Sequence, residues 1–168
     1  IIVAGAAPAY RRADWRHWLD EDGDCQNTRQ EVLIRDSKVL VLFRDERSCE
    51  VAWGEWEDAY TAEIINDPSQ IDIDHLVALQ DAHRSEGASW PKDQKAAYAN
   101  DLSVRFHLVV TRAAVNRTKG SKGPDRWRPD RRDRQCQYAM AYGAIKAAHG
   151  LSASQAERAA LRALLATC

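Results

Sequence analysis

The chain has 168 residues, a length that fits one domain and leaves little room for a second. Apolar residues make up 45% and charged residues 29%, as in a soluble globular protein with a core. No apolar run approaches the 18 residues that a membrane-spanning helix needs, and 8 glycines with 5 prolines exclude collagen-like and low-complexity classes. We therefore expect a single domain, a monomer without a membrane partner.

The charge is unevenly distributed although the net charge is only −1. Residues 104–146 hold eleven Lys and Arg and three Asp, a local net charge of +8, so the remainder of the chain carries −9. Such a segment can form a basic face for a polyanion such as nucleic acid. A solvated surface of salt bridges explains the same pattern.

Four cysteines are widely spaced, and none belongs to a Cys-x-x-Cys pair, which argues against structural zinc. Two disulfides in an oxidising compartment suit this pattern, with four free thiols as the alternative. Of the three pairings we favour Cys25–Cys49 and Cys136–Cys168, because each closes a moderate loop within one half of the chain. Residues 1–7 are small and apolar without a basic stretch, so they do not make a complete signal peptide, and we expect the start of a mature secreted chain.

The first half of the sequence predicts two helices, two paired strands and a turn. These are, in order, a helix over 14–20, a helix over 28–36 capped by Asn27 or Thr28, a buried strand over 38–43, its hairpin partner over 50–56 and a turn over 66–69. Residues 71–77 then alternate between apolar and polar side chains up to His75, as in a strand.

The second half is mostly helical. The expected elements are a helix over 91–99, a strand over 105–111, a short helix over 112–119 capped by Thr111 and ended by Gly120, a basic loop over 120–129, and helices over 136–149 and 154–166. The last helix opens with a capping box at Ser154 and Glu157. Strands followed by helices without regular alternation indicate the α+β class.

The most informative stretch ends in Asp74 and His75. Alternation places Asp72 and Asp74 on one strand face, with His75 where the strand ends. By itself, a carboxylate beside a histidine is common, and a surface Asp next to a hydrogen-bonded His is the simpler explanation. Here, however, a second strand and a short helix follow, and that helix carries Asn116 about one turn before Lys119. This is the layout of a ββα-metal finger.

Six segments carry a wider resemblance and occur in one order along the chain: 24–33, 58–61, 72–77, 99–102, 116–120 and Trp127. In this ordered set the chain resembles secreted bacterial HNH nucleases of the His-Me finger superfamily, related to the nuclease domain of GmrSD-type restriction enzymes. The resemblance implies an N-terminal tail over 1–13 and a nuclease domain over 14–168. Its ββα finger, at about 71–120, would lie in a mostly helical single α+β domain with a small antiparallel sheet.

The resemblance also implies one divalent metal ion, Mg²⁺ or Mn²⁺, held by the Asp74 carboxylate and the Asn116 amide oxygen. His75 would be the general base that takes a proton from the attacking water. The metal would stabilise charge on the departing 3′-oxygen, so that the products carry 5′-phosphate ends. Lys119 would be a catalytic residue that contacts a phosphate.

One position departs from the family. The middle Asn of HNH nucleases orients the base His nine residues before the metal-binding Asn, and here that position is His107. Three roles stay open for His107: it orients the base through a hydrogen bond to a backbone carbonyl, it is a third metal ligand, or it is a packed strand residue.

Several further residues are expected at or near the site. Substrate contacts are assigned to Arg117, Lys119, Lys122, Arg126 and Trp127, the last as a stacking residue. The metal ligands would be held in place by three neighbouring residues, Arg29, Glu31 and Asp72. Arg29 and Glu31 could instead form an ion pair with each other. His83 lies either near the site or at a surface helix position. The acidic residues 20–24 with Glu31 are either a plain turn or a Ca²⁺ loop, whose glycine then stands fourth rather than sixth.

We therefore expect a secreted, metal-dependent endonuclease of low sequence specificity that hydrolyses DNA, with RNA left open. A nuclease toxin or RNA-cutting enzyme on the same finger is one alternative. A disulfide-bonded binding module without catalysis is the other.

Overall fold

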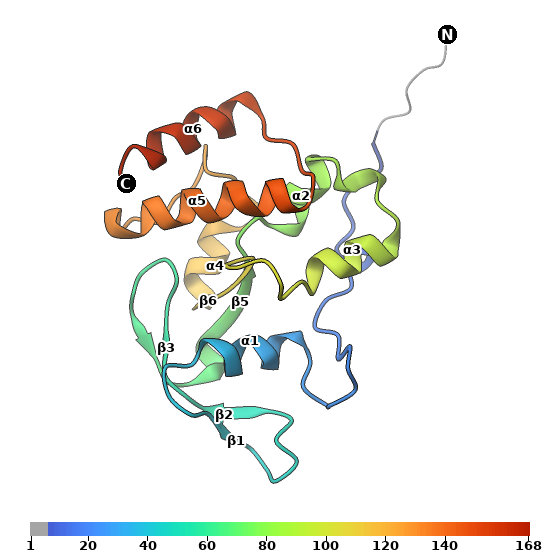
Figure 1. The fold of residues 1–168 in the computed structure, drawn as a ribbon, viewed down its shortest axis with the longest axis vertical. Coiled ribbons are helices and arrows are strands. Elements are labelled where there is room, and N and C mark those ends of the chain that lie inside the picture. Colours follow the sequence, from blue (N-terminus) through green and yellow to red (C-terminus); the bar gives the residue numbers. More distant parts are fainter. Residues whose placement is uncertain (1–6) are drawn as a thin grey trace.

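The computed structural model describes residues 7–168 as a mixed α+β domain, which confirms the expected fold class (Figure 1). Its helices within these residues are α1 (Thr28–Asp36), α2 (Leu79–Arg84), α3 (Lys92–Ala99), α4 (Ala113–Lys119), α5 (Arg132–Ala148) and α6 (Gln155–Leu165). Its strands are β1 (Leu42–Phe43), β2 (Val51–Trp53), β3 (Trp56–Glu57), β4 (Ile64–Ile65), β5 (Ile71–His75) and β6 (Leu108–Arg112). Short 3₁₀ turns are η1 (Arg12–Asp14), η2 (Pro68–Gln70) and η3 (Gly87–Ser89).

The strands form three antiparallel pairs: β1 with β2, β3 with β4, and β5 with β6. The β5–β6 pair is the longest and lies in the middle of the molecule, with α4 directly after β6 (Figure 1). Its register runs from Ile71 opposite Arg112 to His75 opposite Leu108 without a bulge. The β1–β2 hairpin lies at one end of the domain, and α6 lies at the other (Figure 1). The β3–β4 hairpin is joined to α5 by the salt bridge between Glu57 and Arg134. Two strands followed by a helix therefore form the centre of the fold.

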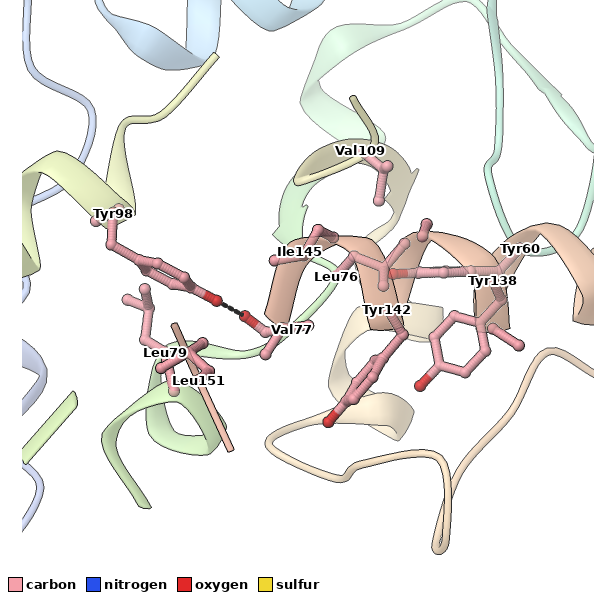
Figure 2. Close-up of a cluster of buried hydrophobic side chains, with 14 of the residues drawn as sticks. Tyr60, Leu76, Val77, Leu79, Tyr98, Val109, Tyr138, Tyr142, Ile145 and Leu151 are labelled. Atoms are coloured by element: carbon pink, nitrogen blue, oxygen red, sulfur yellow. Dashed lines mark hydrogen bonds between the residues drawn. The ribbon is translucent and has the colours of Figure 1, made fainter. Parts of the chain in front are cut away.

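Two clusters of buried side chains support this unit. The larger one joins α2, α3, α5 and α6, and the hydroxyl of Tyr98 within it donates to the carbonyl of Val77 at 2.7 Å (Figure 2). The smaller cluster lies between α1 and the strands and takes Ile71 and Ile73 from β5. Because alternate residues of a strand face opposite sides, Asp72 and Asp74 lie on the other face.

A buried polar network connects α2 to the two C-terminal helices. The ammonium of Lys146 lies 3.0 Å from a carboxylate oxygen of Glu157 and 3.4 Å from one of Asp81. The hydroxyl of Tyr142 donates to Asp81. Asp81 is fully buried and would be costly to bury alone, so these partners compensate for its charge.

Both expected disulfides are present. Cys25 is bonded to Cys49 and joins the acidic turn to the β1–β2 hairpin. Cys136 is bonded to Cys168 and joins α5 to the segment after α6.

Some predicted elements are wrong. Residues 14–20 form no helix; only the 3₁₀ turn η1 lies near them, and Trp18 has a left-handed backbone with φ of 58°. The expected buried strand over 38–43 is reduced to β1, and Leu40 is 93% exposed. The apolar composition of 38–43 indicates a core strand, but this segment is part of a small two-stranded hairpin, in which only Val41 and Phe43 pack against the smaller core cluster while Leu40 and Leu42 are exposed.

Other boundaries shift for local reasons. The strand expected from residue 105 begins at Leu108, because Phe106 has a φ of 63°, a left-handed conformation that strands exclude. Thr111 does not cap α4, since its hydroxyl donates to Asp58. Gly120, with a φ of 55°, ends α4 as expected. The helices over 28–36 and 154–166 are confirmed, the latter with its capping box.

Within the described residues, no helix combines the length and apolar character that crossing a membrane requires.

Candidate functional site

Three of the predicted site residues line one cavity. Asp74 and His75 come from the end of β5, Asn116 comes from α4, and the cavity between them has a volume of about 320 Å³. Its other walls come from α2, from the turn after α4 and from the N-terminal segment. The strand pairing of β5 with β6 places α4 beside the end of β5, which brings residues more than 40 positions apart to one wall.

Asp74 is almost completely buried, and its carboxylate has two partners. The hydroxyl of Tyr60 donates to Oδ2 at 2.6 Å, and the ammonium of Lys119 lies 2.9 Å from the same oxygen. Burial raises the pKa of Asp74, although Lys119 and the hydrogen bond from Tyr60 both favour the charged form. Asp74 is thus held in one orientation at the cavity wall.

The structure gives Lys119 a place different from the expected one. Its side chain is fully buried, and its ammonium bonds Asp74 and the carbonyl oxygen of His75, the latter at 3.0 Å. It does not line the cavity. The expectation that Lys119 contacts a phosphate is therefore wrong for this structure, because its charge is already used inside the protein.

Two aromatic rings lie nearly parallel to the imidazole of His75. The indole of Trp18 is stacked on it at 5.7 Å between ring centroids, and the ring of Tyr98 is stacked at 6.4 Å. Its Nε2 bonds the carbonyl oxygen of Ala99 at 2.8 Å. Because a carbonyl only accepts hydrogen bonds, Nε2 carries the proton and Nδ1 keeps its lone pair.

The free nitrogen of His75 is accessible. Nδ1 has no hydrogen-bond partner among residues 7–168 and is not enclosed by them. Burial of the ring lowers the pKa of His75 well below its ordinary value. The imidazole is therefore neutral at pH 7 and can accept a proton from a group in the cavity.

His107 is fully buried behind this arrangement. Its Nε2 bonds the carbonyl oxygen of Tyr98 at 2.7 Å, so His107 and His75 bond consecutive carbonyls at the end of α3. The two imidazole centroids lie 5.7 Å apart. His107 does not line the cavity, so its placement argues against a third metal ligand and fits both the orienting role and that of a packed residue.

Asn116 is oriented by Asp72. Its side-chain nitrogen donates to a carboxylate oxygen of Asp72 at 3.0 Å, which leaves the amide oxygen free to accept or ligate. Arg29, expected beside these residues, instead donates to the backbone carbonyls of Pro68 and Ile71. It thus fixes the start of β5 and not the ligands themselves.

Glu31 lies away from the cavity, near the acidic turn. Burial raises the pKa of its carboxyl, and the charges of Asp24, Asp22 and Asp20 add to that effect. The alternative Arg29–Glu31 ion pair is absent from the described part of the chain. Ligand oxygens of the three turn aspartates lie within 4.8 Å of one another, and exposed acidic groups often cluster in this way without an ion.

The basic segment divides into paired and free side chains. Arg112, Arg131 and Arg134 form salt bridges with Glu63, Asp133 and Glu57. Arg117 and Lys122 are exposed and have no carboxylate partner among residues 7–168, whereas Arg126 lies 3.9 Å from Asp125. None of these three lines the cavity, so any contact with substrate would be made on the surrounding surface.

Trp127 is half-buried, with its ring edge-on to Tyr60 at 5.0 Å and to Tyr138 at 5.6 Å. It packs against the large core cluster instead of standing free in the basic loop. His83 is buried on α2 and bonds the carbonyl of Pro8, so neither a surface position nor a place on the Asp74 cavity applies to it.

Three residues of the site were not expected from the sequence: Tyr60, Trp18 and Arg12. Tyr60 belongs to one of the segments that carry the resemblance to the nuclease family, 58–61, so the sequence did contain a signal for its place at the site. Trp18 and Arg12 lie in a stretch interpreted as helix or tail, and only the tertiary structure brings them to β5.

The sequence was compared with known proteins. No family model and no solved structure matches it. An "uncharacterized secreted protein" of Arthroderma benhamiae is 36% identical over 164 residues, which cover 98% of this chain and 78% of that protein. The chain therefore belongs to the same family as this fungal protein. With its two disulfides, the chain is a secreted, extracellular protein, as expected from the cysteine spacing.

Proposed function

We propose that this protein is a secreted, metal-dependent endonuclease that hydrolyses phosphodiester bonds, with His75 as general base. The observation that carries the proposal is the cavity at the end of the β5–β6 pair, which collects Asp74, His75 and Asn116 from a strand, strand, helix unit. The order of these residues matches the finger of HNH nucleases, which the chain resembles.

The donor set fits a hard divalent cation. Asn116 offers a free amide oxygen because Asp72 occupies its nitrogen, and Asp74 offers a carboxylate at the same wall. Oxygen donors of this kind suit Mg²⁺ or Mn²⁺ better than zinc. When bound, such an ion supplies positive charge that stabilises the phosphate and the departing oxygen.

The protein's own residues then have distinct tasks. His75 accepts a proton at Nδ1 from water in the cavity, and its hydrogen bond to Ala99 keeps that nitrogen in place. Lys119 and Tyr60 fix the carboxylate of Asp74. The described residues that line the cavity do not form a recognisable base-reading module, and this favours low sequence specificity.

Cleavage of supercoiled plasmid with Mg²⁺, with Mn²⁺ and with EDTA tests the proposal. Metal-dependent nicking that EDTA abolishes is expected, with a loss of at least about 10²-fold in His75→Ala. Asn116→Ala should lose metal affinity in calorimetric titration, while Thr118→Ala, on the exposed side of the same helix, should behave as wild type. Parallel RNA substrates separate a DNA-cutting from an RNA-cutting enzyme. Absence of cleavage of either nucleic acid would leave the disulfide-bonded binding module.

A further inference from the structure

The cavity needs a cation that can meet an anionic substrate, and Lys119 is not available for this purpose. Its charge is buried against Asp74. Among residues 7–168, eleven line the cavity, and only one of these is Lys or Arg: Arg12, from η1. Asp74, His75 and Asn116 line the same cavity.

Arg12 is exposed, and its guanidinium has no carboxylate partner among residues 7–168. The hydroxyl of Tyr10 interacts with it, and a hydrogen bond to His17 orients it. Nδ1 of His17 bonds the carbonyl oxygen of Trp15 at 3.0 Å, so that nitrogen carries the proton and Nε2 accepts from Nη2 of Arg12 at 3.4 Å. The guanidinium is thus held by a neutral acceptor and keeps its full positive charge for a ligand.

The segment that carries Arg12 is fixed on both sides. Pro8 accepts a hydrogen bond from His83 at 2.7 Å, and Trp15 is fully buried against Trp90 and Tyr98. Tyr10 and Arg12 of this fixed segment line the cavity, although both lie within the tail expected over 1–13. Residues 1–6 of that tail lie outside the described residues. A fixed Arg loses less conformational freedom on binding than one in a loose tail.

We propose that Arg12 binds the phosphate group of the nucleic-acid substrate that enters this cavity, which Asp74 and Asn116 also line. The planar guanidinium can donate two parallel hydrogen bonds to phosphate oxygens, a geometry that Lys cannot match. This inference rests on the proposed nuclease function and adds the substrate-binding residue that Lys119 was expected to supply.

Arg12→Ala and Arg12→Lys test the role, with Arg11→Ala as the matched control, because Arg11 is the exposed neighbour that does not line the cavity. Duplex DNA binding is measured by fluorescence anisotropy with Ca²⁺ in place of Mg²⁺, over a range of salt concentrations. Arg12→Ala should flatten the plot of log affinity against log salt by about one unit. It should also lower turnover by about 10²-fold, with Arg12→Lys in between.

Two further measurements make the result decisive. The affinity for Mn²⁺ and the melting temperature should be the same in Arg12→Ala and Arg11→Ala, since Arg12 is neither a metal ligand nor part of the core. If the wild type cleaves nucleic acid, and Arg12→Ala and Arg11→Ala show equal salt slopes and equal turnover, the role of Arg12 is overturned. The nuclease function is not affected by that result. A wild-type protein that neither binds nor cleaves nucleic acid would overturn both.

Discussion

The ammonium of Lys119 lies 2.9 Å from a carboxylate oxygen of Asp74; Lys119 is fully buried, and Asp74 is buried except where it lines the cavity. The two residues come from α4 and β5, so the pair ties the helix of the finger to its first strand. A buried ion pair of this kind costs desolvation energy for both groups, and it is maintained only while both charges are present. Asp74 therefore depends on Lys119 for its charged form.

Lys119→Met should lower the free energy of unfolding by about 3–5 kcal/mol, because the substitution leaves a buried carboxylate without its counter-ion. Urea denaturation monitored by tryptophan fluorescence measures the change. Lys122→Met, at an exposed lysine one turn further along, is the control and should stay within about 0.5 kcal/mol of wild type. Equal stabilities of the two variants would show that the pair contributes nothing to folding.

The stability of the fold should fall as the pH falls from about 6.5 to about 4. Burial lowers the pKa of His107 to about 4 from an ordinary value of 6.5. Between these values the unfolded chain binds a proton that the folded chain does not, so stability rises with pH there and is fully present above 6.5. The shift corresponds to about 3 kcal/mol. Chemical denaturation at a series of pH values measures it.

His107→Asn isolates this contribution, since the amide nitrogen can still donate to the carbonyl of Tyr98 without titrating. The variant should be less sensitive to acid than wild type by most of that amount. His75, whose pKa burial also lowers, leaves a residual dependence in the same direction. An unchanged pH profile in His107→Asn would contradict the assignment.

Trp18→Ala should raise the pKa of His75 toward its ordinary value, because removal of the stacked indole opens one face of the imidazole to water. A pH titration followed by NMR on histidine-labelled protein reports this pKa directly and requires no activity. Trp53→Ala, on the exposed side of β2, is the control. If both variants leave the titration of His75 unaltered, the stack has no influence on the base.

Loss of either disulfide should destabilise the protein by about 3–4 kcal/mol, since the bridges close chain separations of 24 and 32 residues. The paired substitutions Cys25→Ser with Cys49→Ser and Cys136→Ser with Cys168→Ser measure each bridge separately. Thermal unfolding of wild type with EDTA alone should show no comparable loss. Melting temperatures that reductant leaves unchanged would contradict this prediction.

The sequence predicted those parts of the fold in which neighbouring residues act together. The alternation of Ile71, Asp72, Ile73 and Asp74 predicted β5 and its two faces, and the capping box predicted the start of α6. Both signals arise from residues within a few positions of each other. The pairing of the cysteines was also predictable, because few arrangements of four are possible.

Side chains whose environment comes from distant segments were not predictable in this way. The spacing of Trp15 and Trp18 indicated a helix, but Trp15 is in the core while Trp18 stacks on His75, and Trp18 itself has a left-handed backbone that a helix excludes. Likewise, Lys119 counted as a surface cation by composition. Its burial depends on the distance between α4 and β5, which no local pattern encodes.

The end of α3 holds both imidazoles, since His75 and His107 bond the adjacent backbone carbonyls of Ala99 and Tyr98 there. Asn100 fixes this helix end. Its side-chain nitrogen donates to the carbonyls of Ala96 and Arg16, and its side-chain oxygen accepts from the backbone nitrogen of Leu19. A small rotation of the last turn of α3 would therefore move the rings of His75 and His107 together. The position of the His75 ring at the cavity therefore depends on a helix end that does not itself line the cavity, and a substitution at Asn100 would misplace the base.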